Sequence, residues 1–397
     1  MVADLVTLAI ITLIAAIAPL VARIIPGRFI PETVFLLAAG AVLGPSLLGV
    51  IQVSETVDFL SELGLGFLFL LAGYEINPSN LTGSQGKRGL ATWLISFGLA
   101  FIAVRLSPDF SISHIDGLAV AIALVTTALG TLLPILKERD LLNTPIGNSV
   151  LSYGTWGELC PVLAIAILLS TRQTWQTMLI LALFVAIAVL VALFYSNTKK
   201  YGGKLYALFE SGAQTTSQTF VRFTVCLLVA LVALSAIFDL DIVLGAFAAG
   251  FILRYIIPEG NHTLELKLEG IGYGLFIPLF FIVSGANINI MAVFAQPVLL
   301  VSFIVLLLII RGLPIFVALA TGKDTRSMTT SAKLSVALYC TTALPIIVAV
   351  TSIAVDVGVM PSDTASVLVS AGALTVFLMP LFSSLLHRME RREAAKE

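Results

Sequence analysis

Thirteen apolar runs, each long enough to cross a lipid bilayer as a helix, constrain this chain more than any other feature. A transmembrane helix needs about 20 mostly apolar residues. Charged residues make up only 11% of the 397 residues and the mean hydropathy is +1.05, whereas soluble domains carry roughly 25% charged residues. Cutting the sequence at charges, Pro and Gly places the runs at 4–22, 29–50, 57–76, 89–106, 115–136, 147–170, 175–196, 219–237, 240–257, 268–287, 296–320, 330–354 and 362–386. We therefore predict an all-α polytopic membrane protein with 13 transmembrane helices. A soluble enzyme is excluded, and so is a nucleic-acid-binding protein, which would need a basic face.

The basic residues lie almost entirely on one side of these predicted helices. Of the 22 Lys and Arg residues, 19 fall in connections on one side, only Arg105 and Arg172 fall on the other, and Arg311 lies within a run. Basic residues accumulate on the cytoplasmic side of membrane proteins. Because an odd number of spans puts the termini on opposite sides, we predict an N-terminus outside and a C-terminus in the cytoplasm.

The sequence carries no motif for a cofactor, a structural metal or a disulfide framework. Cys160, Cys226 and Cys340 all lie inside apolar runs, and the three histidines are far apart in the chain. No GxGxxG fingerprint of a dinucleotide site is present. We expect one membrane domain over 1–386 and a short charged cytoplasmic tail at 387–397, with no regulatory domain and no cofactor.

Three short matches in the same order indicate an internal repeat. Thr126-Thr127-Ala128-Leu129 recurs at 341–344, the sequence at 73–77 is echoed at 285–289, and Ala38-Ala39-Gly40 is echoed at 248–250. The offset lays the first six spans on the last six, which divides the domain into repeat one (1–170), a linker helix (175–196) and repeat two (219–386). A shift of seven spans inverts the second copy, an arrangement common in secondary transporters. The alternative is a duplicated structural bundle without transport.

The two Thr-Thr-Ala-Leu segments lie in the fifth and twelfth spans, and both are followed by proline in mid-membrane. Proline removes a helical hydrogen bond and kinks a helix, and threonine hydroxyls can satisfy the freed carbonyl groups. Two ordinary kinks are one reading. The symmetric placement favours the other, two broken helices that cross and point their half-helix ends at an ion site. The predicted crossing segments contain Thr126, Thr127, Thr131, Thr341 and Thr342.

Glu158 and Arg311 are the two ionisable residues near the centre of a span. A charge there costs roughly 2.5–3.5 kcal/mol on insertion scales, which is tolerable if the two side chains face one another or water. One reading is a static ion pair that holds the bundle together. The other is a proton and cation site, because intramembrane carboxylates mark such pathways. We predict that Glu158 binds the ion with Thr126, Thr127 and Thr155, and that Arg311 is its charge partner.

Small and polar residues around these charges predict a hydrated cavity. Gly157 precedes Glu158, and Ser284 to Asn287 interrupt the tenth span. We predict that Gly157, Ser284 and Asn287 line the cavity, although Ser284 and Asn287 equally fit a loop at the outer end of their span. Glu75 and Lys333 lie near cytoplasmic span ends, where we expect their side chains to snorkel to the surface.

Three segments of the sequence resemble a known family. The run from Gly117 through Thr126-Thr127-Ala128 to Leu136-Lys137-Glu138-Arg139-Asp140 is similar to helix 5 of the monovalent cation:proton antiporter superfamily, in its bacterial sodium/proton antiporter and potassium-efflux branch. The segments 40–45 and 280–285 are similar to that branch as well. The resemblance implies thirteen helices, a homodimer, a location in the bacterial inner membrane, and an elevator-like motion of a core domain.

The resemblance also suggests roles for individual residues. Glu158 falls on the ion-binding aspartate of helix 6, Gly157 on the polar position before it, and Arg311 on the basic position of helix 11. The sequence departs from the family pattern at three places. Glu158 replaces an aspartate, Gly157 replaces a polar residue, and Tyr339-Cys340-Thr341-Thr342 replaces a more charged segment.

Together these features predict a secondary transporter, not an enzyme, that exchanges Na⁺, Li⁺ or K⁺ for protons. The expected partners are the cation, protons, membrane lipid and a second copy of the chain, with no metal beyond the transported cation. A single central carboxylate beside a permanently charged arginine predicts electroneutral exchange, one for one. The alternatives are a sodium-coupled symporter of an organic solute on a related inverted-repeat fold, and an ion channel.

Overall fold

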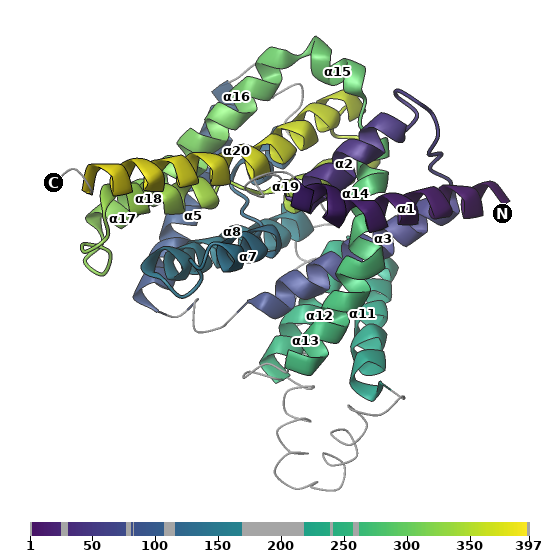
Figure 1. Ribbon diagram of the computed structural model, residues 1–397, viewed down its shortest axis with the longest axis horizontal. Helices are drawn as coiled ribbons and strands as arrows, with labels where there is room; N and C mark the ends of the chain where they lie inside the picture. The colour runs from purple at the N-terminus through teal and green to yellow at the C-terminus, as the bar shows by residue number, and fades with distance from the viewer. Residues whose placement is uncertain are drawn as a thin grey trace, which may run out of the picture.

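A computed structural model describes residues 2–24, 31–76, 81, 83–106, 116–168, 218–238, 241–256 and 262–394. Within these ranges the regular structure is helical, and no strand is present. The predicted linker helix at 175–196 lies outside the described residues. Figure 1 shows the helices as a bundle in which the N- and C-termini lie at opposite ends of the long axis.

The helices of the first half are α1 (Val2–Ile24), α2 (Glu32–Leu43), α3 (Glu55–Glu75), α5 (Ser84–Leu106), α6 (Asp116–Leu124), α7 (Leu129–Glu138) and α8 (Pro145–Leu168). Those of the second half are α11 (Thr219–Ile237), α12 (Ile242–Ile256), α13 (His262–Ile271), η2 (Gly272–Phe276), α14 (Ile277–Ala286), α15 (Ile290–Ala295), α16 (Pro297–Leu307), η3 (Leu308–Gly312), α17 (Leu313–Thr321), α18 (Thr330–Tyr339), α19 (Leu344–Asp356) and α20 (Ser362–Ala394). The elements η2 and η3 are π-helical turns that continue their neighbouring α-helices.

The apolar runs of the sequence become these helices. Nine helices of the described chain are long and apolar enough to cross a membrane, and three shorter apolar helices lie at 32–43, 117–133 and 242–254. They coincide with twelve of the predicted runs, and the total of 13 stays a prediction because the run at 175–196 is not described. α20 continues to Ala394, so the stretch expected to be a tail from 387 begins as a helical extension.

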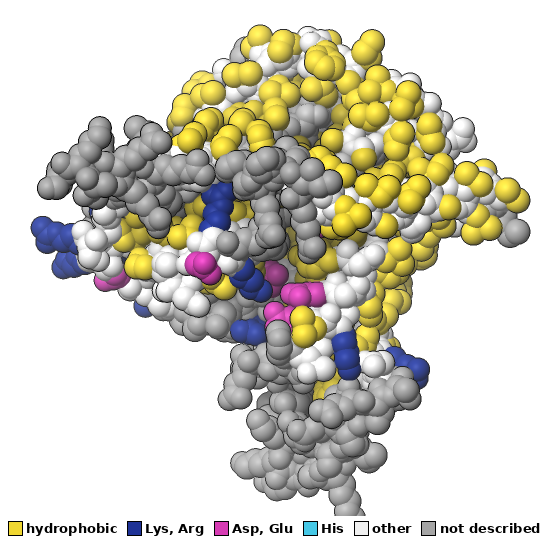
Figure 2. Space-filling model, viewed as in Figure 1, with side chains coloured by type: hydrophobic (Ala, Val, Ile, Leu, Met, Phe, Trp, Pro, Cys, Tyr) yellow, Lys and Arg dark blue, Asp and Glu magenta, His cyan; other side chains and the backbone are white. Residues whose placement is uncertain are grey.

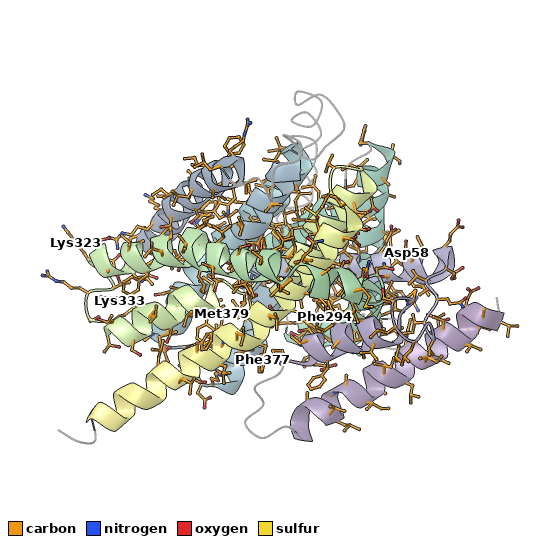
Figure 3. The ribbon with its side chains drawn as sticks, turned by 90° about the horizontal axis from the view of Figure 1, so that it is seen from above. Asp58, Phe294, Lys323, Lys333, Phe377 and Met379 are labelled. Atoms are coloured by element: carbon orange, nitrogen blue, oxygen red, sulfur yellow. The ribbon has the colours of Figure 1, made fainter. Side chains whose placement is uncertain are left out.

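The outer surface of the bundle is apolar, as a lipid-facing surface must be. Large apolar side chains are exposed along α1, α5, α15 and α16; Phe294 is 79% exposed and Val298 is 74% exposed. Figure 2 shows a continuous apolar surface over the upper part of this view, with charged side chains gathered in the region below it. Figure 3 places Lys323 and Lys333 at one end of the bundle and Asp58 at the other.

Two pairs of helices pack so closely that only glycine fits between them. A Cβ atom at Gly40 of α2 would overlap the Ile282 carbonyl oxygen of α14, and one at Gly285 of α14 would overlap the Leu37 carbonyl oxygen of α2. Small residues let helix backbones approach in membrane proteins. α2 and α14 are therefore held backbone to backbone at two adjacent points.

The same contact recurs between α3 and α12. A Cβ at Gly73 of α3 would overlap the Phe247 carbonyl oxygen of α12, and one at Gly250 of α12 would overlap the Leu70 carbonyl oxygen of α3. Gly73 and Gly250 belong to the repeated segments of the sequence. Each close pair therefore joins a helix of the first half to a helix of the second half.

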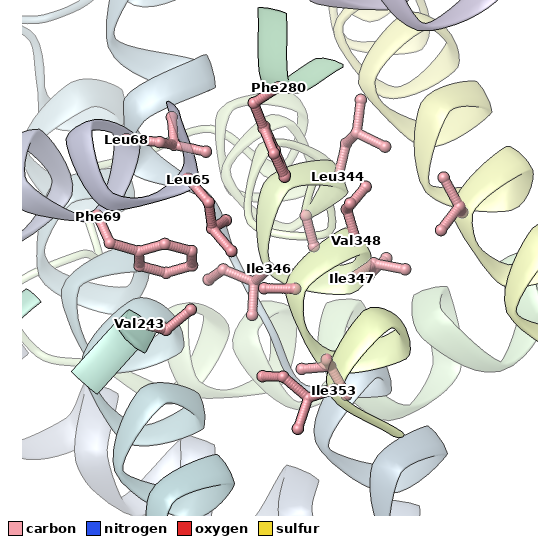
Figure 4. Close-up of a cluster of buried hydrophobic side chains, with 14 of the residues drawn as sticks. Leu65, Leu68, Phe69, Val243, Phe280, Leu344, Ile346, Ile347, Val348 and Ile353 are labelled. Atoms are coloured by element: carbon pink, nitrogen blue, oxygen red, sulfur yellow. The ribbon is translucent and has the colours of Figure 1, made fainter. Parts of the chain in front are cut away.

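Two breaks interrupt the fifth helical unit of each half at matching positions. α6 ends at Leu124 and α7 begins at Leu129, whereas α18 ends at Tyr339 and α19 begins at Leu344, an offset of 215 at both points. Pro345 lies in the first turn of α19, where its missing N–H leaves no helical bond unmade. Beside the break, Leu65 and Phe69 of α3 and Phe280 of α14 point into one apolar cluster with Ile346 of α19 (Figure 4).

Candidate functional site

The two broken segments cross, and backbone hydrogen bonds join them. The Ala128 N–H donates to the Thr342 carbonyl oxygen at 2.9 Å, and the Thr127 N–H donates to the Gly157 carbonyl oxygen of α8 at 2.8 Å. Extended backbone at membrane depth must find hydrogen-bond partners inside the protein. These bonds supply them, and they place the crossing directly against α8.

Thr127 ties the crossing together through its side chain. Its hydroxyl donates to the Cys340 carbonyl oxygen at 2.6 Å. The same oxygen accepts from the Arg311 guanidinium, at 3.3 Å from Nε and 3.1 Å from Nη2. Arg311 also donates from Nη2 to the Tyr153 carbonyl oxygen at 2.9 Å. The fully buried arginine therefore ties the first broken segment to α8, and the Thr127 hydroxyl extends this connection to the second segment.

Gly157 makes room for this arginine. A Cβ at position 157 would overlap both Arg311 Nη2 and Thr127 Oγ1. The guanidinium therefore occupies the space that a side chain at 157 would need. Gly157 was predicted to line a cavity, but here its missing side chain lets Arg311 and Thr127 approach α8 closely. This contact explains why glycine occupies the position where the family resemblance implies a polar residue.

The predicted ion pair between Glu158 and Arg311 is not formed. Arg311 directs its donors to Thr127 and to the Tyr153 carbonyl oxygen, as described above, while its Nη1 has no partner among the described residues. The Glu158 carboxylate instead lies near the backbone N–H groups of Leu129 and Gly130, with which it interacts electrostatically. The reason is positional: the side chains of consecutive helical residues point about 100° apart, and Arg311 fills the side of α8 at Gly157.

Glu158 lies at the N-terminus of the half-helix α7. Leu129 and Gly130 are the first two residues of that helix, and their N–H groups have no partner within it. A helix N-terminus also carries a partial positive charge that favours an anion. Glu158 is 2% exposed, and its Oε2 has no hydrogen-bond partner in the described part of the chain. One carboxylate oxygen is thus left free for a proton or a cation.

A second carboxylate, Glu75, faces the same site. It ends α3, and its charge acts on Glu158. Its Oε2 is buried, without a hydrogen-bond partner among the residues described, and lies 3.9 Å from the position that a Cβ would take at Gly130. The expectation that Glu75 snorkels to the surface is therefore wrong. The end of α3 packs against α7 of the broken fifth unit, so this helix end meets other protein groups.

The remaining predicted residues divide between the site and the packing around it. The hydroxyls of Thr126, Thr131 and Thr155 donate to carbonyl groups of their own segments, at 2.9, 3.0 and 2.7 Å, which leaves their lone pairs free. Thr341 and Thr342 likewise donate to the Leu338 and Tyr339 carbonyl oxygens beside the second break, at 2.7 and 2.8 Å.

Ser284 and Asn287 do not line the crossing. Ser284 lies in the last turn of α14 and Asn287 caps its end, and their neighbours Gly285 and Ala286 pack on α2. Of the two readings of this polar interruption, the helix end is correct. In the described part of the chain, no group of three or more His, Cys, Asp or Glu residues forms a metal cluster.

Comparisons with known proteins decide the family. The model of the family described as "Sodium/hydrogen exchanger, transmembrane" matches residues 10–386. The chain belongs to the sodium/hydrogen exchanger family. It is thus a multi-span membrane protein of the monovalent cation:proton antiporter superfamily, as the helix-5 resemblance predicted.

Individual members of the family are distant in sequence. YjbQ of Bacillus subtilis is 26% identical over 412 residues, which cover 98% of this chain and 64% of YjbQ, so the chain spans just under two thirds of that relative. The Na⁺/H⁺-K⁺ antiporter GerN of Bacillus cereus is 25% identical over 88% of each chain. The structure of the sodium/proton antiporter MjNhaP1 from Methanocaldococcus jannaschii has a TM-score of 0.64 over 96% of both chains at 17% identity, which shows a shared fold.

Proposed function

We propose that this member of the sodium/hydrogen exchanger family exchanges a monovalent cation, Na⁺, Li⁺ or K⁺, for protons across the bacterial inner membrane. The observation that carries the proposal is the Glu158 carboxylate, buried near the middle of α8 beside the N-terminus of α7, with one oxygen that has no hydrogen-bond partner among the described residues. An intramembrane carboxylate is expensive and marks an ion or proton pathway. The name of GerN, a Na⁺/H⁺-K⁺ antiporter, supports the same activity.

In the proposed cycle, Glu158 holds a proton in one step and a cation in another. Hard cations take oxygen ligands, and carboxylate, hydroxyl and backbone oxygens surround the site. Glu75 and Glu158 supply carboxylate oxygens, and Thr126 and Thr155 offer the lone pairs of their hydroxyls. Thr127 is left out of this set because Cys340 and Arg311 use its hydroxyl.

We propose that the two halves form an inverted repeat that provides alternating access. Adding 210 to the numbers of Leu37 and Gly40 gives Phe247 and Gly250, and adding 212 to Leu70 and Gly73 gives Ile282 and Gly285. The contact of α2 with α14 thereby maps onto the contact of α12 with α3. A site at the crossing of two inverted halves opens to either side when one half moves against the other. We propose an elevator-like form of this motion in a homodimer, with the N-terminus outside the cell.

We also propose that exchange is electroneutral, although the site contains two carboxylates rather than the single one expected from the sequence. Two buried carboxylates close together repel when both are ionised. The pair therefore holds one monovalent cation at a time, either a proton or the transported ion. Its net charge is then the same in both directions, and each cation exchanges for one proton.

The test uses purified protein in proteoliposomes that contain a pH-sensitive dye. Glu158→Gln should abolish cation-driven proton flux, whereas Glu158→Asp should retain flux with an altered apparent affinity. Elution as a single peak in size-exclusion chromatography checks that both variants are folded. Wild-type flux from Glu158→Gln would refute the assignment, and flux of an organic solute that depends on Na⁺ would favour the symporter instead.

A further inference from the structure

The span built from α13, η2 and α14 carries a tyrosine that the proposed exchange does not yet use. Tyr273 lies in the π-helical turn η2, and its hydroxyl donates to the Gly130 carbonyl oxygen of α7 at 3.5 Å. π-helical turns recur at functional sites because they displace a side chain from its ordinary helical position. Arg311 also projects from such a turn, η3. Tyr273 therefore reaches α7, the half-helix whose N-terminus faces Glu158.

Carboxylates from three helices lie close enough to this hydroxyl to act on it electrostatically. The Tyr273 hydroxyl interacts electrostatically with Glu75 of α3, Glu269 of α13 and Glu158 of α8. Lys137 of α7 acts on Glu75, as do Glu269 and Glu265 of α13. Glu75 is in turn the charged residue that acts on Glu158. Acidic groups of α13, α3 and α8 are thus close enough to one another and to Tyr273 to interact electrostatically.

Two independent features indicate a ligand beside the hydroxyl. Glu75 Oε2 is buried and, in the described chain, has no hydrogen-bond partner. Gly130 has no side chain, and a Cβ there would lie 3.8 Å from the Tyr273 hydroxyl and 3.9 Å from Glu75 Oε2. An unpartnered carboxylate oxygen and a phenol oxygen therefore face the same point on α7. Tyr273 itself is 36% exposed.

We propose that the Tyr273 hydroxyl is an oxygen ligand for the transported cation as it moves between the α13 side and the Glu75–Glu158 pair. The inference rests on the proposed exchange. A phenol that donates its proton to the Gly130 carbonyl still offers its lone pairs. It adds an oxygen ligand without adding charge. Because a neutral phenol does not compete for a proton near neutral pH, this ligand strengthens cation binding and leaves proton binding unchanged.

Tyr273→Phe tests the inference because it removes one oxygen and keeps the aromatic ring. Proton flux is measured in proteoliposomes against cation concentration, with the cation supplied on each side in turn. We expect the apparent KM for Na⁺ to rise about 3- to 10-fold from the α13 side, the range that corresponds to one hydrogen-bond-sized interaction. The maximal rate and the pH at half-maximal flux should stay as in the wild type.

Gly274→Ala is the matched control. It alters the same π-helical turn, and its Cβ meets no atom within 4 Å, so it should leave the KM unchanged. An unchanged KM in Tyr273→Phe would overturn the inference, and so would a lower maximal rate with an unchanged KM, which indicates a structural role only. Absence of cation-driven proton flux in the wild type would instead refute the proposed exchange, which separates the two failures.

Discussion

Replacing the threonine that joins the two broken helices should destabilise the protein strongly. Thr127→Val removes a hydroxyl at nearly constant volume. The Cys340 carbonyl loses its 2.6 Å hydrogen bond, and the buried Arg311 guanidinium loses its acceptor at 3.1–3.3 Å. A neutral hydrogen bond contributes about 0.5–1.5 kcal/mol, and one to a charged group about 1.5–3 kcal/mol. We therefore expect Thr127→Val to lower the free energy of unfolding by about 3 kcal/mol.

The neighbouring threonine provides a matched control. Thr126 is as fully buried as Thr127, but its hydroxyl donates only to the Ala123 carbonyl oxygen, three residues earlier, at 2.9 Å. Such local bonds to the preceding turn contribute little to helix stability. Thr126→Val should therefore lower the free energy of unfolding by less than about 1 kcal/mol.

Unfolding by SDS titration in mixed micelles measures both losses. A double-mutant cycle of Thr127→Val with Arg311→Met isolates the bond between these side chains, and its coupling energy should be at least about 1 kcal/mol. Equal losses for the two threonine variants, or additive losses in the cycle, would refute the assignment of Thr127 as the residue that joins the broken helices.

Four further predictions concern other parts of the structure. Gly157→Ala should displace the Arg311 guanidinium and destabilise the protein by about 1–3 kcal/mol, the usual cost of overpacking, in the same SDS titration; a stabilised variant would contradict this. Glu75→Gln should weaken cation affinity, measured as the apparent KM for the cation in proteoliposomes. In the wild type, the exchange rate should not change with an imposed membrane potential. A potential-dependent wild-type rate would rule out one-for-one exchange. In the loop before α12, burial raises the pKa of Asp241 to about 6, so ionising it costs stability as the pH rises through that value. Asp241→Asn should therefore raise the melting temperature at pH 8 but not at pH 4, and an equal gain at both would show that its ionisation is not responsible.

The sequence alone was enough to predict the helices and the positions of the breaks. A transmembrane helix satisfies its own backbone hydrogen bonds, so length and apolarity identify it without knowledge of its neighbours. The predicted run at 219–237 coincides with α11, and the Thr-Thr-Ala-Leu segments contain both breaks. The segments at 73–77 and 285–289, which the sequence indicated only as a repeat, contain Gly73 of the contact between α3 and α12 and Gly285 of the contact between α2 and α14.

Tertiary structure decided which group each buried charge meets. Glu158 and Arg311 were both recognised as central, but their pairing depends on how α8 and η3 are rotated, and no local pattern records that rotation. The structure turns Arg311 to Thr127 and Glu158 to the N-terminus of α7. Glu75 was assigned to the surface because it lies at a helix end, yet that end meets the interior where α7 is broken. Hydropathy depends on each residue and its sequence neighbours, whereas an ion site depends on distances between residues far apart in the chain, which only the folded arrangement sets.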